Sequence, residues 1–472
     1  MNKRGISYRV VAIFLMVIVL VFTTGCTKGG DPAAQEAYKS VNLVYWSVWN
    51  DEDMMRDLIS AYKKIRPNVS IEYRKKIYET YEQELLEAMA EDRGPDVFSI
   101  HNTWVSQYKN RILPLPTSTR VPVRYQAGTI KKEEVTEFKT TKSITPFGVQ
   151  QTYLDVVGED VIREINVGTD KEVNIQNKVL ALPLATDNLV MFYNKDLLNA
   201  SGILEPPTNW SDFTEHVKRI TRIDSETGDI LISGTALGTS DNIPRDFDIL
   251  SVLMMQNRAE MTNSNGYATF AENISGVAQN PAVGALDFYV QFASPLFQTY
   301  SWNSKMPDAF TAFRDGKVGY FFGYTYHRDL LKSTAPKLNF AIAPMPQVGQ
   351  QQKANYASYW VETVSKKTDN DDYAWDFVQF ITDEENVTAY LEKTKKPTAL
   401  RSTKIVNTQL EDPEIIVFAE QIFTAKSWYR GYDSVTAENA FAQMIAGALL
   451  GEEKINRVID QAVSKINRTI TD

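Results

Sequence analysis

The chain has few residues of the kinds that build metal sites, disulfides or thiol nucleophiles. Its 472 residues include one cysteine, so no intramolecular disulfide can form and a zinc site built from several thiolates is excluded. The three histidines, His101, His216 and His327, are far apart in the sequence and no pair has the spacing of metal ligands. Glycine and proline are also few, at 23 and 19 residues, which excludes collagen-like and low-complexity chains.

Basic residues are outnumbered by acidic ones, 50 to 59, and the formal net charge is −9. A protein that binds nucleic acid needs a basic patch or stripe to neutralise phosphates, and short mixed runs such as 132–134 do not form one. We therefore expect no nucleic-acid partner. The length suffices for a large buried core and suggests about three domains, or two large ones.

The longest apolar run lies at the amino terminus. Three basic residues precede an unbroken apolar stretch at residues 10–22, which is too short for a membrane span of about 20 residues and is typical of a secretory leader. The sequence that follows, 23–26, ends in Cys26 and resembles a bacterial lipobox, in which the cysteine becomes the lipidated first residue of the mature protein. The pattern usually has Leu where this chain has Thr23. We expect a lipoprotein signal peptide over 1–25; the alternatives are secretion with cleavage nearby, or an uncleaved signal anchor.

The segment that follows Cys26 is small and polar. Residues 26–40 are therefore expected to form a flexible tether between the lipid and the folded protein. No later stretch reaches 18 consecutive apolar residues, so the remainder is expected to be soluble.

The hydrophobic pattern after residue 40 alternates between two periods. Short runs rich in β-branched and aromatic residues predict strands, and apolar residues at helical spacing between them predict helices. Strands that alternate with helices indicate a parallel, doubly wound sheet, whose ligands sit beyond the carboxyl ends of the strands. The predicted strands are 41–49, 69–73 and 96–100, and the residues at two of their ends are 49–51 and 101–104.

The region 113–178 is less regular. Four prolines in its first half exclude long helices there, and we predict surface loops plus a short helix around 160–165. Residues 179–193 again have the composition of a strand, although Pro183 suggests that it bends or changes sheets. Asn209 can cap a helix whose apolar face runs from Trp210 to Ile220.

Five passages, in this order along the chain, carry a resemblance to a known family. They are 45–52; 94–98; 182–197 with 206–210; 312–317 with 344–346; and 364–367 with 374–377 and the carboxyl-terminal helix pair. Together they resemble the extracellular solute-binding proteins of bacterial sugar ABC transporters, the group that includes maltose-binding protein. The resemblance covers nearly everything after residue 40.

This resemblance implies an α/β, two-lobed periplasmic-binding-protein-like fold of type II, with doubly wound sheets joined by a hinge. The hinge crossings would lie near 182–188, 358–363 and 396–401. The first lobe would comprise 41–184 plus 364–398, and the second 185–360 plus 400–472.

The resemblance also implies a function. Such a protein captures a sugar, here expected to be an oligosaccharide, between its lobes and delivers it to the permease subunits of an ABC transporter. It needs no cofactor, and we expect a monomer held by its lipid on the extracytoplasmic face of the cell membrane. Two alternatives stay open: a lipid-anchored glycan-processing enzyme, since two of the 59 acidic residues would suffice, and an adhesin or scaffold with a cleft that serves no transport. No motif of a thiol, serine or zinc enzyme is present, so we expect no enzyme.

Sugars are bound by aromatic faces that stack on their C–H patches and by Asp, Asn, Glu and Arg side chains that satisfy their hydroxyls. The resemblance places candidates at strand ends, at the hinge and after Gly323, where the family often has a stacking aromatic. For each the alternative is a cap, a turn or core packing, and His101 and His327 are expected near the cleft as satisfied polar groups. The ligand-binding candidates are Trp49, Asn50, Asp51, Asn102, Thr103, Trp104, Asp187, Asn242, Tyr324, Tyr326, Trp360 and Arg430.

Overall fold

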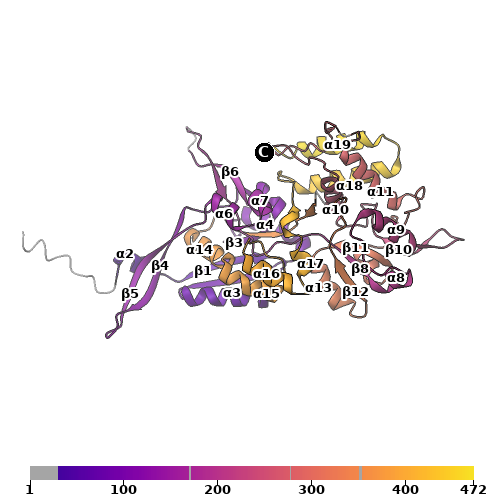
Figure 1. Ribbon diagram of the computed structural model, residues 1–472. Coiled ribbons are helices and arrows are strands. Elements are labelled where there is room, and N and C mark those ends of the chain that lie inside the picture. The colour runs from indigo at the N-terminus through magenta and orange to yellow at the C-terminus, as the bar shows by residue number, and fades with distance from the viewer. Residues whose placement is uncertain (1–29, 169–171, 277, 350–352, 472) are drawn as a thin grey trace, which may run out of the picture.

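The computed structural model describes residues 30–168, 172–276, 278–349 and 353–471. They form two α/β lobes that lie side by side (Figure 1), each around its own sheet and hydrophobic cluster. The two-lobed α/β fold predicted from the sequence is confirmed. The predicted leader and Cys26 lie outside the described residues. Among the residues described, no helix is both long and apolar enough to cross a membrane.

The first lobe is built on a four-stranded sheet in the order β14-β3-β1-β2. β1 runs parallel to both β2 and β3, as the strand–helix alternation predicts, and β14 is antiparallel to β3. α3 packs against this sheet because Met55, Leu58 and Tyr62 recur at helical spacing on its buried face. The elements are β1 (Val41–Ser47), α3 (Glu52–Ile65), β2 (Val69–Lys75), α4 (Tyr78–Ala90), β3 (Val97–His101), α5 (Val105–Tyr108), β14 (Trp360–Val364), α14 (Asp371–Thr382) and α15 (Glu384–Thr394).

Two β-hairpins project from this lobe (Figure 1), where the sequence predicted mainly loops. The prediction of loops was wrong. The prolines exclude long helices there but not strands, because each strand of a two-stranded ribbon is an edge, which tolerates Pro122 opposite Phe138. The helix predicted around 160–165 is instead the end of α7 followed by a strand. The elements are β4 (Ser118–Ala127), β5 (Glu133–Lys142), α6 (Pro146–Thr152), α7 (Asp155–Val161), β6 (Ile162–Asn166) and β7 (Ile175–Val179).

A short helix, α2 (Pro32–Ala37), lies on the β4–β5 hairpin. Asp31 caps it by accepting a hydrogen bond from the Ala33 amide at 2.9 Å, and Pro32 occupies its first turn, where the missing N–H costs nothing. The guanidinium of Arg124 lies 4.1 Å from the ring centroid of Tyr38. Part of the segment predicted as a flexible tether is therefore a folded element.

The second lobe is built on a five-stranded sheet in the order β12-β8-β11-β10-β9. The predicted helix after Asn209 is present: this side chain accepts from the Asp212 amide at 2.9 Å, and the apolar face of α9 is buried. The strands are β8 (Val190–Asn194), β9 (Arg222–Ile223), β10 (Ile230–Thr235), β11 (Val318–Gly323) and β12 (Phe340–Ala343). The helices are α8 (Lys195–Ala200), α9 (Trp210–Ile220), α10 (Asp246–Gln256), α11 (Pro281–Val290), α12 (Ala309–Arg314), α13 (Thr325–Thr334), α18 (Ser434–Leu450) and α19 (Ile455–Asn467).

The chain passes between the two hydrophobic clusters near residues 185–189, near 356–357 and in 406–415. After the third passage Ile422 packs once more in the first cluster before Trp428 packs in the second. The first two passages hydrogen-bond to each other through the Ser358 amide and the Asp187 carbonyl, at 3.1 Å. Thr186 binds the carbonyls of Pro397 and Thr398, at 3.0 and 2.9 Å.

The passages differ from the predicted crossings in two respects. Ala357, Tyr359 and Val361 pack in the first cluster, so that lobe resumes earlier than 364. The third passage follows α16 (Thr403–Glu411), because Ile405 and Val406 also pack in the first cluster. Beyond it lie α17 (Ile416–Ala419) and the two-stranded sheet of β13 (Asn355–Tyr356) and β15 (Ala425–Lys426).

A candidate ligand site between the lobes

Aromatic side chains of both lobes meet in one group. Trp49, Tyr78 and Trp360 come from the first lobe, and Tyr326 comes from α13 of the second. The ring of Tyr326 stacks on Trp49, with centroids 5.0 Å apart and planes 30° apart. The ring centroid of Trp49 also lies 5.4 Å from that of Tyr78 and 6.4 Å from that of Trp360. We call these four residues the inter-lobe aromatic group.

Strand and helix ends position this group. Trp49 follows β1, Tyr78 begins α4, and Trp360 begins β14, so all three project from one edge of the first sheet. Tyr78 is 48% exposed and the other three rings are partly buried. Apolar ring faces that remain accessible between two lobes are suited to stacking on a ligand.

A chain of polar contacts runs beside the aromatic group from one lobe to the other. His101, at the end of β3, contacts Ser358 with 2.9 Å between Nε2 and Oγ. The hydroxyl of Ser358 also accepts from Nη2 of Arg245, at 3.4 Å. Arg245 pairs with Asp248, which accepts from the hydroxyl of Tyr324 at 2.7 Å. Burial lowers the pKa of His101 to about 3, so its ring is neutral.

A further acidic group lies at this boundary. Glu438, in α18, is exposed, and partial desolvation of its carboxyl group raises its pKa to about 7. The positive charge of Arg245 opposes this shift, while the negative charges of Asp248 and Glu82 add to it. Glu82 belongs to α4 of the first lobe, so charged residues of both lobes influence the pKa of Glu438.

Asp187 lies in the first passage between the lobes, as the sequence predicted, but its carboxylate has protein partners. It accepts from the backbone N–H of Thr325 at 3.1 Å and from the hydroxyl of Thr325 at 2.6 Å. Burial outweighs these bonds and raises its pKa to about 6. The carboxylate thereby fixes the first turn of α13, which carries Tyr326.

Asn50 and Asp51 point away from the aromatic group. Asn50 is buried and accepts from the hydroxyl of Tyr390 at 2.6 Å and from Lys396 at 3.2 Å. Asp51 is exposed and pairs with Lys75. Asn50 therefore packs within the first lobe, and Asp51 forms a surface ion pair without capping α3 through its side chain.

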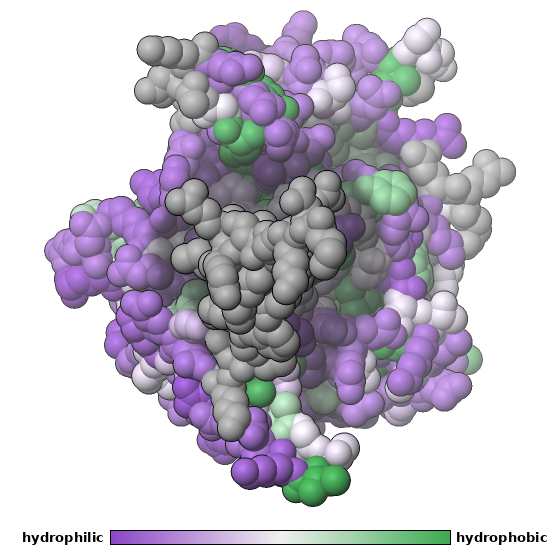
Figure 2. Space-filling model, turned by 90° about the vertical axis from the view of Figure 1, so that its left-hand side faces the viewer, coloured by the Kyte–Doolittle hydropathy of each residue, from purple (hydrophilic) through white to green (hydrophobic). Residues whose placement is uncertain are grey.

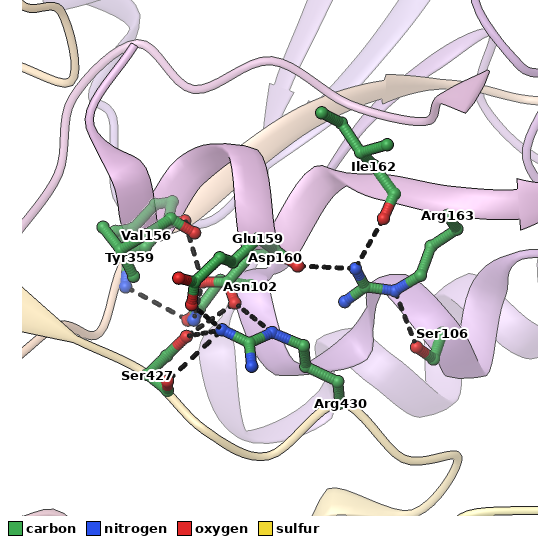
Figure 3. A network of polar contacts seen from close by, with 10 residues as sticks. All are labelled: Asn102, Ser106, Val156, Glu159, Asp160, Ile162, Arg163, Tyr359, Ser427 and Arg430. Atoms are coloured by element: carbon green, nitrogen blue, oxygen red, sulfur yellow. Dashed lines mark hydrogen bonds and ion pairs between the residues drawn. The ribbon is translucent and has the colours of Figure 1, made fainter. Parts of the chain in front are cut away.

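Asn102 and Arg430 belong to a separate polar junction centred on Asp160 (Figure 3). Asp160 is 1% exposed. One of its carboxylate oxygens accepts from Asn102 and from Tyr359, each at 2.9 Å, and the other accepts from Ser427 at 2.5 Å and from Arg430 at 3.1 Å. Asp160 is in α7 of the first lobe, whereas Arg430 follows Trp428 and Tyr429, which pack in the second core. The junction therefore joins the two lobes.

The remaining candidates divide between the two lobes. Thr103 is buried and contacts the ring of His101 at 2.8 Å. Trp104 packs edge-on against Trp360, with centroids 5.5 Å apart, and extends the aromatic group inward. Asn242 accepts from the indole N–H of Trp302 at 2.8 Å, within the second lobe. Tyr324 is 2% exposed and stacks beneath Tyr326 at 6.5 Å.

Of the predicted residues, the structure thus brings Trp49, Trp104, Tyr324, Tyr326 and Trp360 together, and it holds the polar candidates in other contacts.

Sequence reasoning missed Tyr78, Arg245, Asp248 and Glu438. Tyr78 had a signal, because it begins the helix after the second strand at the sheet edge where ligands bind. The other three had no sequence signal, because these charged residues at the start of α10 and in α18 come near the aromatic group only where the two lobes meet.

The arrangement can hold a ligand that offers both apolar faces and hydrogen-bonding groups. The rings of Trp49 and Tyr326 contact each other and would have to part for a ligand to enter. Beside them Arg245 offers donors and Glu438 offers acceptors, whereas Asp248 is buried and already pairs with Arg245. Within the described residues, no group of three or more His, Cys, Asp or Glu side chains could hold a metal ion.

A sequence profile identifies the class of protein to which this two-lobed chain belongs. The profile of the bacterial extracellular solute-binding protein family matches residues 49–388, and the chain belongs to that family.

Individual relatives are distant. A putative binding protein of Brucella abortus (strain 2308) is 23% identical over 209 residues, which are 44% of this chain and 47% of that protein. A putative binding protein of Brucella suis biovar 1 (strain 1330) matches to the same extent. The chain therefore matches about half the length of these curated relatives.

Solved structures share the whole fold. The GacH receptor of Streptomyces glaucescens was determined unliganded and with acarbose. It superposes with a TM-score of 0.66 at 16% identity, and the match includes 92% of this chain and 99% of the receptor. The cyclic α-maltosyl-1,6-maltose binding protein of Arthrobacter globiformis has a TM-score of 0.65 at 19% identity and covers 91% of this chain and 98% of that one. At these identities the likeness concerns the fold.

Proposed function

We propose that this protein captures an oligosaccharide between its two lobes and delivers it to the permease of an ABC transporter, as a lipoprotein held at Cys26 on the extracytoplasmic face of the membrane. The observation that carries the proposal is the inter-lobe aromatic group, in which rings of both lobes meet at the boundary between them. Membership of the solute-binding family supports it, as do the sugars named for structural relatives such as the GacH receptor.

The geometry suggests how binding would be coupled to closure. The ring centroids of Trp49 and Tyr326 are only 5.0 Å apart. A sugar ring between them would need a stacking contact of about 3.5–4.0 Å on each of its faces, so none fits. Entry therefore requires the lobes to separate, and a sugar that contacts both lobes would favour a closed state by its differential affinity.

A sugar suits this place because the rings of the inter-lobe aromatic group lie near the charged side chains of Arg245 and Glu438. A pyranose presents an apolar C–H face and hydroxyls that both donate and accept. Arg245 can donate to such hydroxyls, and Glu438 can accept from them, while buried Asp248 holds Arg245 in place. In this proposal the ligand is released unchanged, and the two carboxylates do not act as an acid–base pair.

Thermal unfolding with a panel of ligands tests the proposal. A ligand that binds only the folded protein raises the midpoint by an amount that grows with the logarithm of its concentration. We expect at least one oligosaccharide to do so, and free amino acids, peptides and polyols to have no effect. The proposal is wrong if no sugar shifts the midpoint, and turnover of a chromogenic glycoside would favour an enzyme instead.

A further inference from the structure

We propose that the tip of the β4–β5 hairpin, residues 128–132, rests on the anionic surface of the membrane that holds the protein. This inference depends on the lipidation of Cys26 in the proposed function, but it concerns a different part of the molecule. It follows from where the described chain begins, from how the hairpin is fixed, and from the side chains at its tip.

The described chain begins on the hairpin itself. Gly30 forms a parallel bridge with Thr136 of β5, and the Asp31 amide donates to the carbonyl of Thr136 at 2.9 Å. A parallel bridge means that the chain at Gly30 runs in the direction of β5, which leads away from the tip. The amino side of Gly30 therefore faces the tip.

Covalent geometry then limits the distance to the lipid. Cys26 is four residues from Gly30, a reach of at most about 14 Å. Thr136 is three residues from the outer end of β5, which corresponds to about 10 Å along the strand. A lipid on Cys26 must therefore enter the bilayer close to the outer half of the hairpin.

The hairpin is fixed to the lobe and can transmit orientation. At its base, Val121 is fully buried in the core of the first lobe, and the Arg120 amide donates to Asp372 of α14 at 3.0 Å. Its middle is covered by α2, where Ala34 is fully buried. Figure 1 shows the hairpin projecting as a ribbon beyond the lobe, with α2 against it. A contact at the tip would therefore set the angle of the whole first lobe.

The tip has the side chains of a membrane-interface contact. Ile130 is 100% exposed, and Lys131 and Lys132 follow it directly and are exposed. Tyr125 is 44% exposed near the outer end of β4. Figure 2, which views this end of the molecule, shows a small hydrophobic patch beside hydrophilic side chains at its lower margin, the direction in which the hairpin points. An apolar residue beside lysines suits the boundary between acyl chains and anionic headgroups.

The charge of the hairpin opposes that of the chain. Residues 118–142 contain six basic and three acidic residues, although the whole chain has a net charge of −9. An acidic protein is repelled by an anionic bilayer except where basic side chains face it. The tip itself, residues 128–132, holds two lysines and no acidic residue; Glu133 follows it, and Glu134 pairs with Arg124 at 3.5 Å. A contact of this tip with the headgroups would hold the inter-lobe site at a fixed height and angle above the membrane.

A fluorescence experiment on the full-length, lipidated protein tests the inference. Cys26 carries the lipid, so an introduced cysteine is the only free thiol. An environment-sensitive dye is placed by Thr129→Cys at the tip or, as a control, by Leu296→Cys, whose native side chain is 93% exposed on the second lobe. The protein is inserted into vesicles of phosphatidylethanolamine and phosphatidylglycerol.

We expect the dye at position 129 to shift to shorter wavelength and to be quenched by nitroxide-labelled lipid, and the dye at position 296 to remain as in water. The changes Ile130→Ser, Lys131→Glu and Lys132→Glu, added to Thr129→Cys, should abolish the shift while the protein stays with the vesicles. A water-like dye at position 129 on vesicle-bound protein overturns the inference and leaves the lipid anchor intact. Protein that does not sediment with the vesicles contradicts the lipid anchor and this inference together.

Discussion

Replacing Asp160 with asparagine is expected to lower the free energy of unfolding by about 3 kcal/mol. The carboxylate is 1% exposed, and each oxygen accepts two hydrogen bonds across the junction between the lobes. An amide has one acceptor oxygen, so either the pair of Asn102 and Tyr359 or the pair of Ser427 and Arg430 loses its partner. Removing one member of a buried ion pair costs about 3–5 kcal/mol. The lower end applies because Arg430 keeps Glu159 at 2.7 Å.

Asp155→Asn is the matched control. Asp155 is in the same helix, α7, and also pairs with an arginine, Arg401, but its side chain is 81% exposed. An exposed ion pair contributes at most about 1 kcal/mol. Urea unfolding followed by tryptophan fluorescence gives both differences from the transition midpoints. Equal losses in the two variants, or a loss below about 1 kcal/mol for Asp160→Asn, would refute the reasoning that this junction is a buried ionic contact between the lobes.

Two further changes test the interior around the site. Burial raises the pKa of Glu362 to about 7, although hydrogen bonds from Ser99 and Tyr45 and the charge of Lys396 act in the opposite direction. The folded state therefore binds more protons than the unfolded state between the two pKa values. The free energy of unfolding should consequently fall as pH rises from about 4.5 to 7. Glu362→Gln should remove its share of this slope, measured by urea unfolding at each pH, and an unchanged slope would contradict the assignment. Gly323→Ala should cost about 1–3 kcal/mol by overpacking, because a Cβ there would lie 2.6 Å from Nδ1 of His327. Gly349→Ala, with nothing within 4 Å, is the control, and a similar loss in both would be evidence against the clash.

The sequence predicted the architecture where periodicity is strong. The alternation over residues 41–101 predicted three parallel strands, and the apolar face of α9 was read correctly from Trp210 to Ile220. It failed at the hairpins, where the pattern is less regular and the prolines exclude only long helices; a ribbon edge tolerates a proline such as Pro122. The helix α2 was missed because its six residues are small and polar, and it is held by packing on the hairpin.

The site was predictable in its aromatic part and not in its polar part. Trp49 and Trp360 follow or begin strands at one sheet edge, so local pattern and family resemblance reach them. Asn102 satisfied the same pattern and Arg430 was a further candidate, but both bind the buried carboxylate of Asp160. Whether a polar side chain is free for a ligand depends on its tertiary partners, and these are invisible to sequence periodicity.

Calorimetric titration of the oligosaccharide that raises the melting midpoint, into wild type, Trp49→Ala and Phe147→Ala, tests the central claim most directly. Trp49 joins the two lobes through Tyr326, and loss of a central aromatic anchor costs about 2 kcal/mol, or roughly 30-fold in affinity. Phe147 is 69% exposed in α6, and its loss should leave the affinity unchanged. Equal affinities in all three proteins would contradict a sugar site at the inter-lobe aromatic group.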